Sequence, residues 1–311
     1  MSSLNIIFAG SGEFGLPTLR ALVDAGHKIV GVYTQPDRPA GRGRQLAATP
    51  IAQAAEKVEM PVIRTDDLNS ITPLPSADLM VVIAFGQKIS QAVANHARLG
   101  SINLHASLLP KFRGAAPINW AILNGEKFSG NSVIRLAQRM DAGAILGQSK
   151  LAIGETETAG ELHDRLAVDG ATLVCRVVAE LANGTAAERQ QDESAVTVAP
   201  KLSRETATLD WSAPADEVAR RINGLSPWPG CRVRLLDPLG TELSQLALLR
   251  ARPVFNSPAG PPGLLTESGT IIAGLGSVEV LEVQPAGKRP MAIADFQRGH
   301  RWTAGLSVES V

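Results

Sequence analysis

The sequence predicts an α/β protein with an open, mostly parallel sheet in its N-terminal half and a small β-rich barrel near its C-terminus. Within the first 150 residues, short apolar runs alternate with helical patterns. These apolar runs are nearly continuous, as in strands buried on both faces of a parallel sheet. Beyond residue 225, proline and glycine become frequent, and short runs alternate between apolar and polar residues.

The predicted N-terminal elements follow the order expected of an open α/β sheet. Apolar runs predict the strands, and helical spacing between capping signals predicts the helices. Gly26 ends the first helix, and Thr49 with Pro50 starts the second as N-cap and first helical residue. In chain order we expect a strand at 4–10, a helix at 16–26, a strand at 28–34, a helix at 49–58, strands at 61–64 and 78–86, a helix at 89–97 and a strand at 101–105.

The polarity and periodicity of the sequence change after a long helical stretch at 158–184. The polar segment 185–211 is weakly periodic, like a linker or a wrapping segment, and a short helix is expected at 215–224. Runs such as CRVRLL and GSVEVLEV then predict strands of a small barrel. We therefore expect a first domain at 1–189, a linker at 190–207 and a second domain at 208–311.

The size and charge of the chain limit its function. A chain of 311 residues suits two domains, because single hydrophobic cores seldom grow beyond about 250 residues. The 30 basic residues balance the 30 acidic ones, so any contact with a nucleic acid must come from a local patch. Aromatic residues make up only 4%, which argues against an aromatic base-stacking surface.

The cysteines and the N-terminal sequence bear on location. Cys175 and Cys231 lie far apart and outside any C-x-x-C pattern, so neither a zinc site nor a disulfide is predicted. The start of the sequence lacks the features of a signal peptide. No run approaches the roughly 18–20 apolar residues of a membrane span. We expect a cytoplasmic protein with no membrane partner.

Asn103 and His105 are the first candidates for catalysis. The other four histidines suit solvated or capping roles, whereas His105 closes a predicted strand two residues after Asn103. In open α/β sheets, ligands bind beyond the carboxyl ends of the strands. An amide that donates to an oxygen gaining negative charge, beside an imidazole that moves a proton, suits acyl transfer. Taken by itself, the stretch 103–117 fits a strand end followed by an ordinary surface turn as well as it fits a functional site.

Asp141 is the candidate third member. A carboxylate normally orients a catalytic imidazole and stabilises its charged form. Asp141 lies in the segment QRMDAGAILG (138–147), in a turn that contains glycine between two apolar runs. Alone, Asp141 would be interpreted as a turn former, and the presence of Asn103 and His105 favours the catalytic interpretation.

A competing signal lies at residues 10–15, which spell G-x-G-x-x-G between a predicted strand and a helix. Such a loop can approach a dinucleotide pyrophosphate closely. The acid expected at the end of the second strand is missing, because that strand ends VYTQP and Asp37 follows a proline. A tight turn is therefore the favoured interpretation.

The segment Asn103-x-His105-x-Ser107-Leu108-Leu109-Pro110, followed by Arg113-Gly114-Ala115-Ala116-Pro117, resembles the signature of folate-dependent formyltransferases. The Asp141 turn resembles the third catalytic element of that family. Four further segments resemble the members that act on methionyl initiator tRNA, so that the resemblance spans nearly the whole chain. These segments are QPDRPAGRGRQLAATP (35–50), KLSRETATLDW (201–211), LSPWPG (225–230) and VQPAGKRPM (283–291).

The resemblance implies a Rossmann-like N-terminal domain that catalyses the reaction and an OB-like C-terminal barrel that binds tRNA. It implies transfer of formyl from 10-formyltetrahydrofolate, as donor substrate, to the methionyl amine of initiator tRNA, without a metal or a nicotinamide. Asn103, His105 and Asp141 would be catalytic, and Arg42 would lie in a loop that reaches the tRNA acceptor end. The residues that would line the folate site are Ser107, Leu108, Leu109 and Pro110. We expect a monomer.

The chain departs from the family pattern at a few positions. Arg139 stands where a glycine is usual, and Ala142 where a threonine is usual. The segment AFGQKIS (84–90) differs from a commoner form with tyrosine and leucine-proline. These changes leave Asn103, His105 and Asp141 in place.

Three alternatives remain open at this point. One is a formyltransferase that acts on a sugar-nucleotide amine or on glycinamide ribonucleotide. Another is a nicotinamide-dependent oxidoreductase that uses the glycine loop, and the missing ribose-binding acid argues against it. The third is a non-enzymatic RNA-binding protein with an inert α/β domain, against which the three candidate catalytic residues argue.

Overall fold

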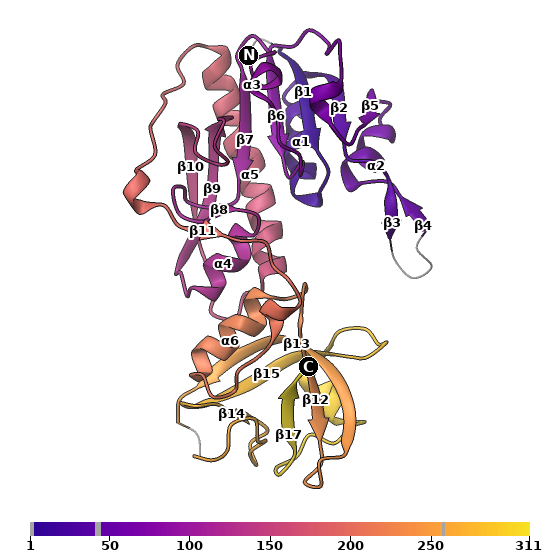
Figure 1. The fold of residues 1–311 in the computed structure, drawn as a ribbon, viewed down its shortest axis with the longest axis vertical. Coiled ribbons are helices and arrows are strands. Elements are labelled where there is room, and N and C mark those ends of the chain that lie inside the picture. Colours follow the sequence, from indigo (N-terminus) through magenta and orange to yellow (C-terminus); the bar gives the residue numbers. More distant parts are fainter. Residues whose placement is uncertain (1–2, 41–44, 257–258) are drawn as a thin grey trace. The chain divides into compact units, whose positions relative to one another are not determined.

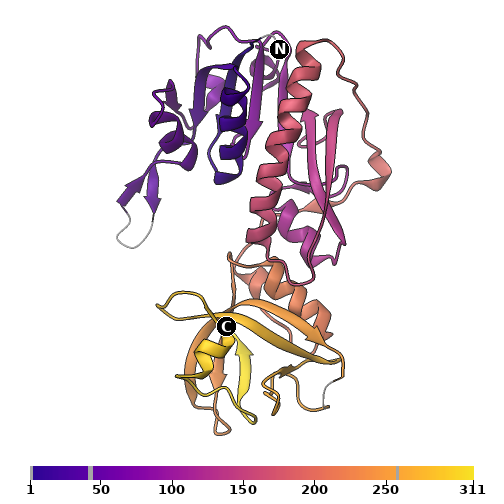
Figure 2. The same ribbon diagram turned by 180° about the vertical axis from the view of Figure 1, so that it is seen from behind.

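The computed structural model describes residues 3–40, 45–256 and 259–311 (Figures 1 and 2). Arg42, the candidate tRNA-binding residue, lies outside the described residues. The chain divides into two compact units, each assembled from three stretches of sequence. Unit 1 comprises Met1–Gly114, Gly130–Leu151 and His163–Val198, and unit 2 comprises Ala115–Ser129, Ala152–Leu162 and Ala199–Val311.

A seven-stranded sheet forms the centre of unit 1 (Figure 1). Its order is β10-β9-β7-β6-β1-β2-β5, in which β5, β2, β1, β6 and β7 pair in parallel and β9 pairs antiparallel to β7. The strand order reverses between β1 and β6, the place where such sheets bind ligands beyond their carboxyl ends. The strands are β1 (Asn5–Gly10), β2 (Lys28–Thr34), β5 (Val62–Arg64), β6 (Leu79–Ile83), β7 (Ser101–His105), β9 (Phe128–Arg135) and β10 (Ile145–Ala152).

Helices and short elements surround this sheet. The helices are α1 (Leu16–Asp24), α2 (Pro50–Glu56), α3 (Gln91–Ala94) and α5 (Ala159–Ala182), with 3-10 turns η1 (Glu13–Gly15), η2 (Leu68–Ser70) and η3 (Glu193–Ala195). The short strands are β3 (Arg38–Ala40) and β4 (Gln45–Ala47), which form a hairpin, together with β8 (Arg113–Gly114) and β11 (Val198–Ala199).

The long helix α5 covers one face of β7 (Figure 2). A Cβ atom at Gly170 of α5 would lie 2.7 Å from a methyl carbon of Leu104, so this glycine permits a close approach. Because side chains alternate along a strand, Asn103 and His105 point to the opposite face. The helix thus packs against one face of β7, and Asn103 and His105 lie on the other face.

Unit 2 is built on an antiparallel sheet that nearly closes into a barrel. Its order is β14-β15-β13-β12-β17, with β16 paired to β15. Leu264 bridges Ser307 of β17 and Leu265 bridges Ile271 of β14, which links the two edges. The elements are α4 (Pro117–Leu123), η4 (Glu205–Ala207), α6 (Ala215–Gly224), β12 (Cys231–Leu236), β13 (Glu242–Val254), β14 (Ile271–Ile272), β15 (Ser277–Pro285), β16 (Met291–Ala292), α7 (Ile293–Gln297) and β17 (Ser307–Ser310).

The predicted fold class, an open α/β sheet followed by a β-rich barrel, is confirmed. The bounds expected for β2, β7 and α6 agree with the structure. The helix expected at 89–97 is a single turn of four residues, because the chain leaves the helix at Asn95 and the Ser101 hydroxyl donates to the carbonyl of Ala94. Among the described residues, no helix combines the length and apolar composition needed to cross a membrane.

Candidate active site

Asn103 and His105 lie at the carboxyl end of β7, on the face opposite α5. In the register with β9, Asn103 pairs with Ile134 and His105 pairs with Ser132. His105 is buried, with 6% of its surface exposed, whereas Asn103 is half-buried. Within the described part of the chain, the Asn103 side chain makes no hydrogen bond, so its amide is available to donate to a substrate.

A backbone carbonyl holds the imidazole of His105. The Nε2 atom lies 2.8 Å from the carbonyl oxygen of Phe112. Because a carbonyl only accepts hydrogen bonds, Nε2 must bear the hydrogen. In the neutral ring, Nδ1 is therefore the basic nitrogen. Phe112 itself has a left-handed backbone with φ of 62°, and its N–H donates to the hydroxyl of Thr197 at 2.8 Å.

The Asp141 carboxylate faces this basic nitrogen. Its Oδ2 atom lies 3.7 Å from Nδ1 of His105, and both side chains are largely buried, at 12% and 7% exposure. The same oxygen accepts a hydrogen bond of 2.9 Å from the backbone N–H of Gly114. Two neighbouring segments, the end of β7 and strand β8, thus meet the more distant loop after β9 here. The arrangement can hold a proton on the imidazole beside a fixed negative charge.

The loop that carries Asp141 lies close against β9. Asp141 has a left-handed backbone with φ of 55°. A Cβ atom at Gly143 would lie 1.8 Å from the carbonyl oxygen of Arg135, so only glycine permits this approach. The amide of Gln191 donates to the carbonyls of Asp141 and Gly143, at 2.7 and 2.8 Å.

Two of the three departures from the family pattern, Arg139 and Ala142, lie in this loop. Arg139 is exposed and forms an ion pair of 2.7 Å with Glu193, while the N–H of Ala142 donates to the carbonyl of Arg139 in a turn. The guanidinium groups of Arg113 and Arg139 beside Glu193 lower the pKa of that carboxyl to about 2. Neither residue displaces the Asp141 carboxylate from His105.

The segment with the candidate folate residues follows His105 directly. Ser107 is fully buried, and its hydroxyl donates to the carbonyl of Lys111 at 2.7 Å. Leu109 is 3% exposed and belongs to a small apolar cluster. Leu108 and Pro110 keep some exposed surface. A ligand would thus meet the side chains of these two residues, whereas Ser107 and Leu109 shape the turn.

Hydrogen bonds from the neighbouring strands fix this turn. The Ser132 hydroxyl donates to the carbonyl of Ser107 at 2.6 Å and accepts from the N–H of Leu109 at 3.1 Å. The amide of Gln148 donates to the carbonyl of Leu109 at 2.9 Å. The turn is therefore preorganised next to His105.

Sequence reasoning missed several residues that build the site, chiefly Phe112, Gly114, Gln191 and Thr197. Gly114 belongs to the Arg113–Gly114 pair of the motif, and Phe112 comes directly before that pair. No local pattern indicates that the backbone of Phe112 holds His105 or that the backbone of Gly114 holds Asp141. Gln191 and Thr197 lie in the stretch interpreted as a linker, and no signal in the sequence could have placed them here.

The glycine loop at residues 10–15 is packed by protein groups. A Cβ atom at Gly10 would lie 2.8 Å from the ring of Phe8 and 2.9 Å from the carbonyl oxygen of Ile83. The Ser11 hydroxyl accepts from the N–H of Gln35 at 3.1 Å. Close packing of β1 against β6 thus explains the first glycine, which supports the tight-turn interpretation.

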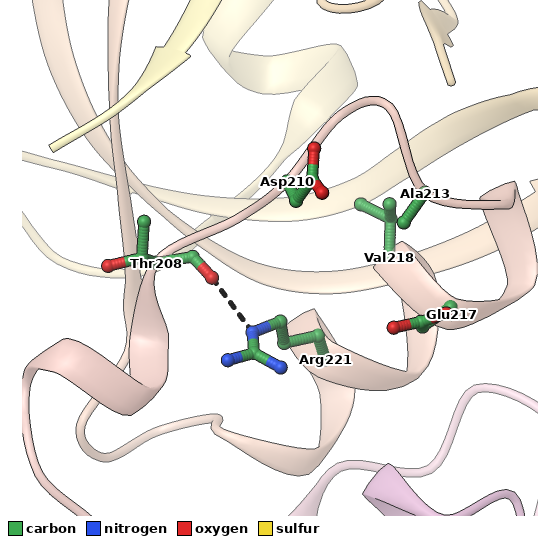
Figure 3. Close-up of a pocket in the computed structure, with 6 residues that line it drawn as sticks. All are labelled: Thr208, Asp210, Ala213, Glu217, Val218 and Arg221. Atoms are coloured by element: carbon green, nitrogen blue, oxygen red, sulfur yellow. Dashed lines mark hydrogen bonds between the residues drawn. The ribbon is translucent and has the colours of Figure 1, made fainter. Parts of the chain in front are cut away.

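A small pocket of about 160 Å³ lies in unit 2 (Figure 3). Arg221 donates through Nε to the carbonyl of Thr208 at 2.8 Å, and Asp210 accepts from the N–H and hydroxyl of Ser212. These polar groups already have partners within unit 2. The residues that line the pocket are Thr208, Asp210, Ala213, Glu217, Val218 and Arg221.

Two family models match this chain. Residues 4–178 match the family described as Formyl transferase, and residues 201–301 match Formyl transferase, C-terminal domain. The chain is 41% identical over 310 residues to a methionyl-tRNA formyltransferase of Chelativorans sp. (strain BNC1), covering 97% of this chain and 98% of the relative. It is 40% identical over 306 residues to that of Methylococcus capsulatus, covering 96% and 97%.

A solved structure with the same fold is the sugar 3N-formyl transferase WlaRD, determined in the presence of dTDP and 5-N-formyl-THF. It superposes with a TM-score of 0.66 over 93% of this chain and 100% of that chain, at 16% sequence identity. At this identity the likeness concerns the fold alone.

Proposed function

The chain belongs to the formyl transferase family, and we propose that it transfers the formyl group of 10-formyltetrahydrofolate to the amino group of methionyl initiator tRNA. The observation that supports this substrate most directly is the 41% identity, over 97% of the chain, to a relative named methionyl-tRNA formyltransferase. Such a protein supplies formylated initiator tRNA for translation initiation.

In the proposed reaction, the neutral methionyl amine attacks the formyl carbon and Asn103 stabilises the resulting oxyanion. Asn103 is half-buried at the end of β7 and its amide has no partner within the described residues. A preorganised donor aimed at a developing negative charge contributes typically about 3–4 kcal/mol to a reaction barrier. The amine is itself the nucleophile, so no metal-bound hydroxide is needed to generate one, and we propose a reaction without a metal.

His105 would take up the proton that the attacking amine loses and deliver it to the leaving nitrogen of the folate. Its Nε2 hydrogen is held by the Phe112 carbonyl, so Nδ1 is the nitrogen that accepts the proton. The 3.7 Å separation from Asp141 then becomes an ion pair between the imidazolium and the carboxylate. Asp141 would thus stabilise the charged ring during transfer.

The substrates would bind to different parts of the chain. Ser107, Leu108, Leu109 and Pro110 would form the folate side of the site, because their turn is preorganised beside His105. Arg42 would contact the tRNA acceptor end. The domain at 1–189 would catalyse transfer, the segment 190–207 would connect the domains, and 208–311 would bind tRNA. We further propose that the protein is a cytoplasmic monomer.

Formylation of a sugar-nucleotide amine or of glycinamide ribonucleotide is not favoured. The chain matches the two methionyl-tRNA formyltransferases at 41% and 40% identity, against 16% for the sugar 3N-formyl transferase WlaRD. Both halves of the chain also fall within the two formyl transferase models.

A direct assay tests the proposal. The purified protein should formylate methionyl initiator tRNA with 10-formyltetrahydrofolate, and uncharged tRNA should remain unmodified. A dTDP-linked amino sugar and glycinamide ribonucleotide serve as competing acceptors in parallel reactions. Faster formylation of either small acceptor than of the charged tRNA would reject the proposed substrate.

A further inference from the structure

Gln191 connects the loop of Asp141 to a buried arginine. Its Nε2 atom donates to the carbonyl oxygens of Asp141 and Gly143, at 2.7 and 2.8 Å. Its Oε1 atom accepts two hydrogen bonds from Arg113, 3.1 Å from Nε and 2.8 Å from Nη2. The side chain of Gln191 therefore bridges the two segments between which the Asp141 carboxylate is held.

The orientation of the Gln191 amide is dictated by its partners. A guanidinium can only donate and a backbone carbonyl can only accept. Oε1 must therefore face Arg113, which leaves both Nε2 hydrogens for the two carbonyls of the loop. Arg113 is itself fixed, because its side chain is 8% exposed and pairs with Glu193 at 2.9 Å.

The loop depends on an external support. Asp141 has φ of 55°, a backbone conformation that non-glycine residues adopt only when the surroundings favour it. The carboxylate is placed by this backbone, and it reaches both Nδ1 of His105 and the N–H of Gly114. A shift of the Asp141 backbone would therefore change the distance between the carboxylate and the imidazole.

We infer that Gln191 is a positioning residue for formyl transfer: its amide holds the Asp141–Gly143 backbone so that the Asp141 carboxylate faces His105. This inference rests on the function proposed above. It assigns an active-site role to a segment that the sequence presents only as polar and weakly periodic. Gln191 acts through Asp141 and does not itself touch a substrate.

Gln191→Glu is the sharpest test, because the variant keeps the size of the side chain and its bond to Arg113. The new carboxylate has no hydrogen to donate and would face two carbonyl oxygens. Since misplacement of a catalytic group by about 1 Å can lower a rate 10²-fold, kcat should fall by about that factor. The KM values for folate and tRNA should stay within twofold of wild type, and the melting temperature should stay within a few degrees.

Two further variants keep the outcome clear. Gln91→Glu is the matched control and should leave kcat unchanged. It adds the same charge on α3 and removes the hydrogen bond of 2.9 Å that the Gln91 amide donates to Asn95. Gln191→Met removes the donor without adding charge and should also lower kcat. It therefore tests the inference even if Gln191→Glu fails to fold. Wild-type kcat in a folded Gln191→Met variant would overturn the inference.

A double-mutant cycle separates positioning from a general structural role. If Gln191 acts through the Asp141 carboxylate, Gln191→Glu should lower kcat by less than about threefold when Asp141 is already Asn, because the two effects are coupled. An equal loss in both backgrounds would overturn the inference. Failure of the wild-type protein to formylate methionyl-tRNA would instead reject the proposed function, so that the two failures are distinguishable.

Discussion

Nδ1 of His105 lies 3.7 Å from Oδ2 of Asp141, while Nε2 of the same ring lies 2.8 Å from the carbonyl oxygen of Phe112. The ring orientation therefore has a backbone determinant that is independent of the carboxylate. In a serine-protease triad the carboxylate binds the nitrogen remote from the substrate and fixes the tautomer. Here the backbone carbonyl fixes the tautomer, and the carboxylate lies beside the basic nitrogen.

Replacement of Asp141 by Asn removes the charge that would pair with the imidazolium and keeps the size of the side chain. We expect kcat for formylation to fall by about 10²-fold or more, as for other groups that stabilise a charged catalytic imidazole. The bond from the Gly114 N–H can persist to the amide oxygen, so the melting temperature should change little. Activity within twofold of wild type would leave Asp141 as a turn former.

Replacement of His105 by Ala removes the proposed proton acceptor. We expect kcat to fall by about 10²–10⁴-fold, the range for general acid–base groups. His96→Ala is a matched control, because Nε2 of His96 also lies 2.9 Å from a backbone carbonyl, that of Pro75, but on the exposed surface. His96→Ala should keep the wild-type kcat, and a His105→Ala variant that retains more than half of the wild-type kcat would show that His105 is not catalytic.

Most of the parallel sheet could be predicted because its strands consist of apolar residues. β9 could not, since three of its buried positions are polar: Ser129, Asn131 and Ser132 are each at most 3% exposed. Asn131 donates to the carbonyl of Leu166 in α5, and Ser132 binds the turn at 107–109. A strand with these residues does not show the apolar run that identifies its neighbours.

Only part of the candidate site, likewise, could be predicted from the sequence. Asn103 and His105 could be singled out because they are two residues apart on one predicted strand. The partners that hold the site are backbone groups or side chains far along the chain. Gln191 is 50 residues from Asp141, so the contact depends on the path of the folded chain after α5. No local pattern encodes such a contact.

Glu161 provides a stability prediction. Its carboxylate accepts from Arg250 at 2.6 and 2.9 Å and from the N–H of Thr158 at 3.0 Å. The Arg250 guanidinium is the main cause that lowers the pKa of Glu161 from 4.5 to about 2. Because the pKa of Glu161 is lower in the folded than in the unfolded protein, the ionised carboxylate stabilises the fold at pH values above the unfolded-state pKa. This stabilisation is lost as the pH falls toward 2.

Glu161→Gln should therefore destabilise the protein near pH 7, by at most about 1 kcal/mol because the pair is half-exposed and screened. The difference in thermal midpoint between wild type and variant should shrink as the pH falls from 4.5 to 2. Calorimetry at pH 7, 4 and 3 measures this trend. A difference that is independent of pH over this range would show that the ionised carboxylate is not its source.

The segment 35–50 raises the last question, which is how a chain with zero net charge could hold a polyanion. Asp37 is the only acid in this segment, and its Oδ1 atom pairs with Nε of Arg64 at 2.7 Å. Strands β3 and β4 pair with each other on either side of residues 41–44 (Figure 1). The basic residues of the segment are Arg38, Arg42 and Arg44.

With three arginines and one acid, the segment carries an excess of two positive charges in the sequence, which suits contact with a phosphate or a base edge. We predict that Arg42→Ala lowers kcat/KM for methionyl initiator tRNA by an amount worth roughly 1–3 kcal/mol if the contact is to a base edge. If the contact is to a phosphate, the salt dependence of tRNA binding should become flatter. Folate affinity should not change in either case, and Arg20→Ala, an exposed arginine of α1, serves as the control. Wild-type kinetics of Arg42→Ala at both low and high salt would show that Arg42 takes no part in tRNA recognition.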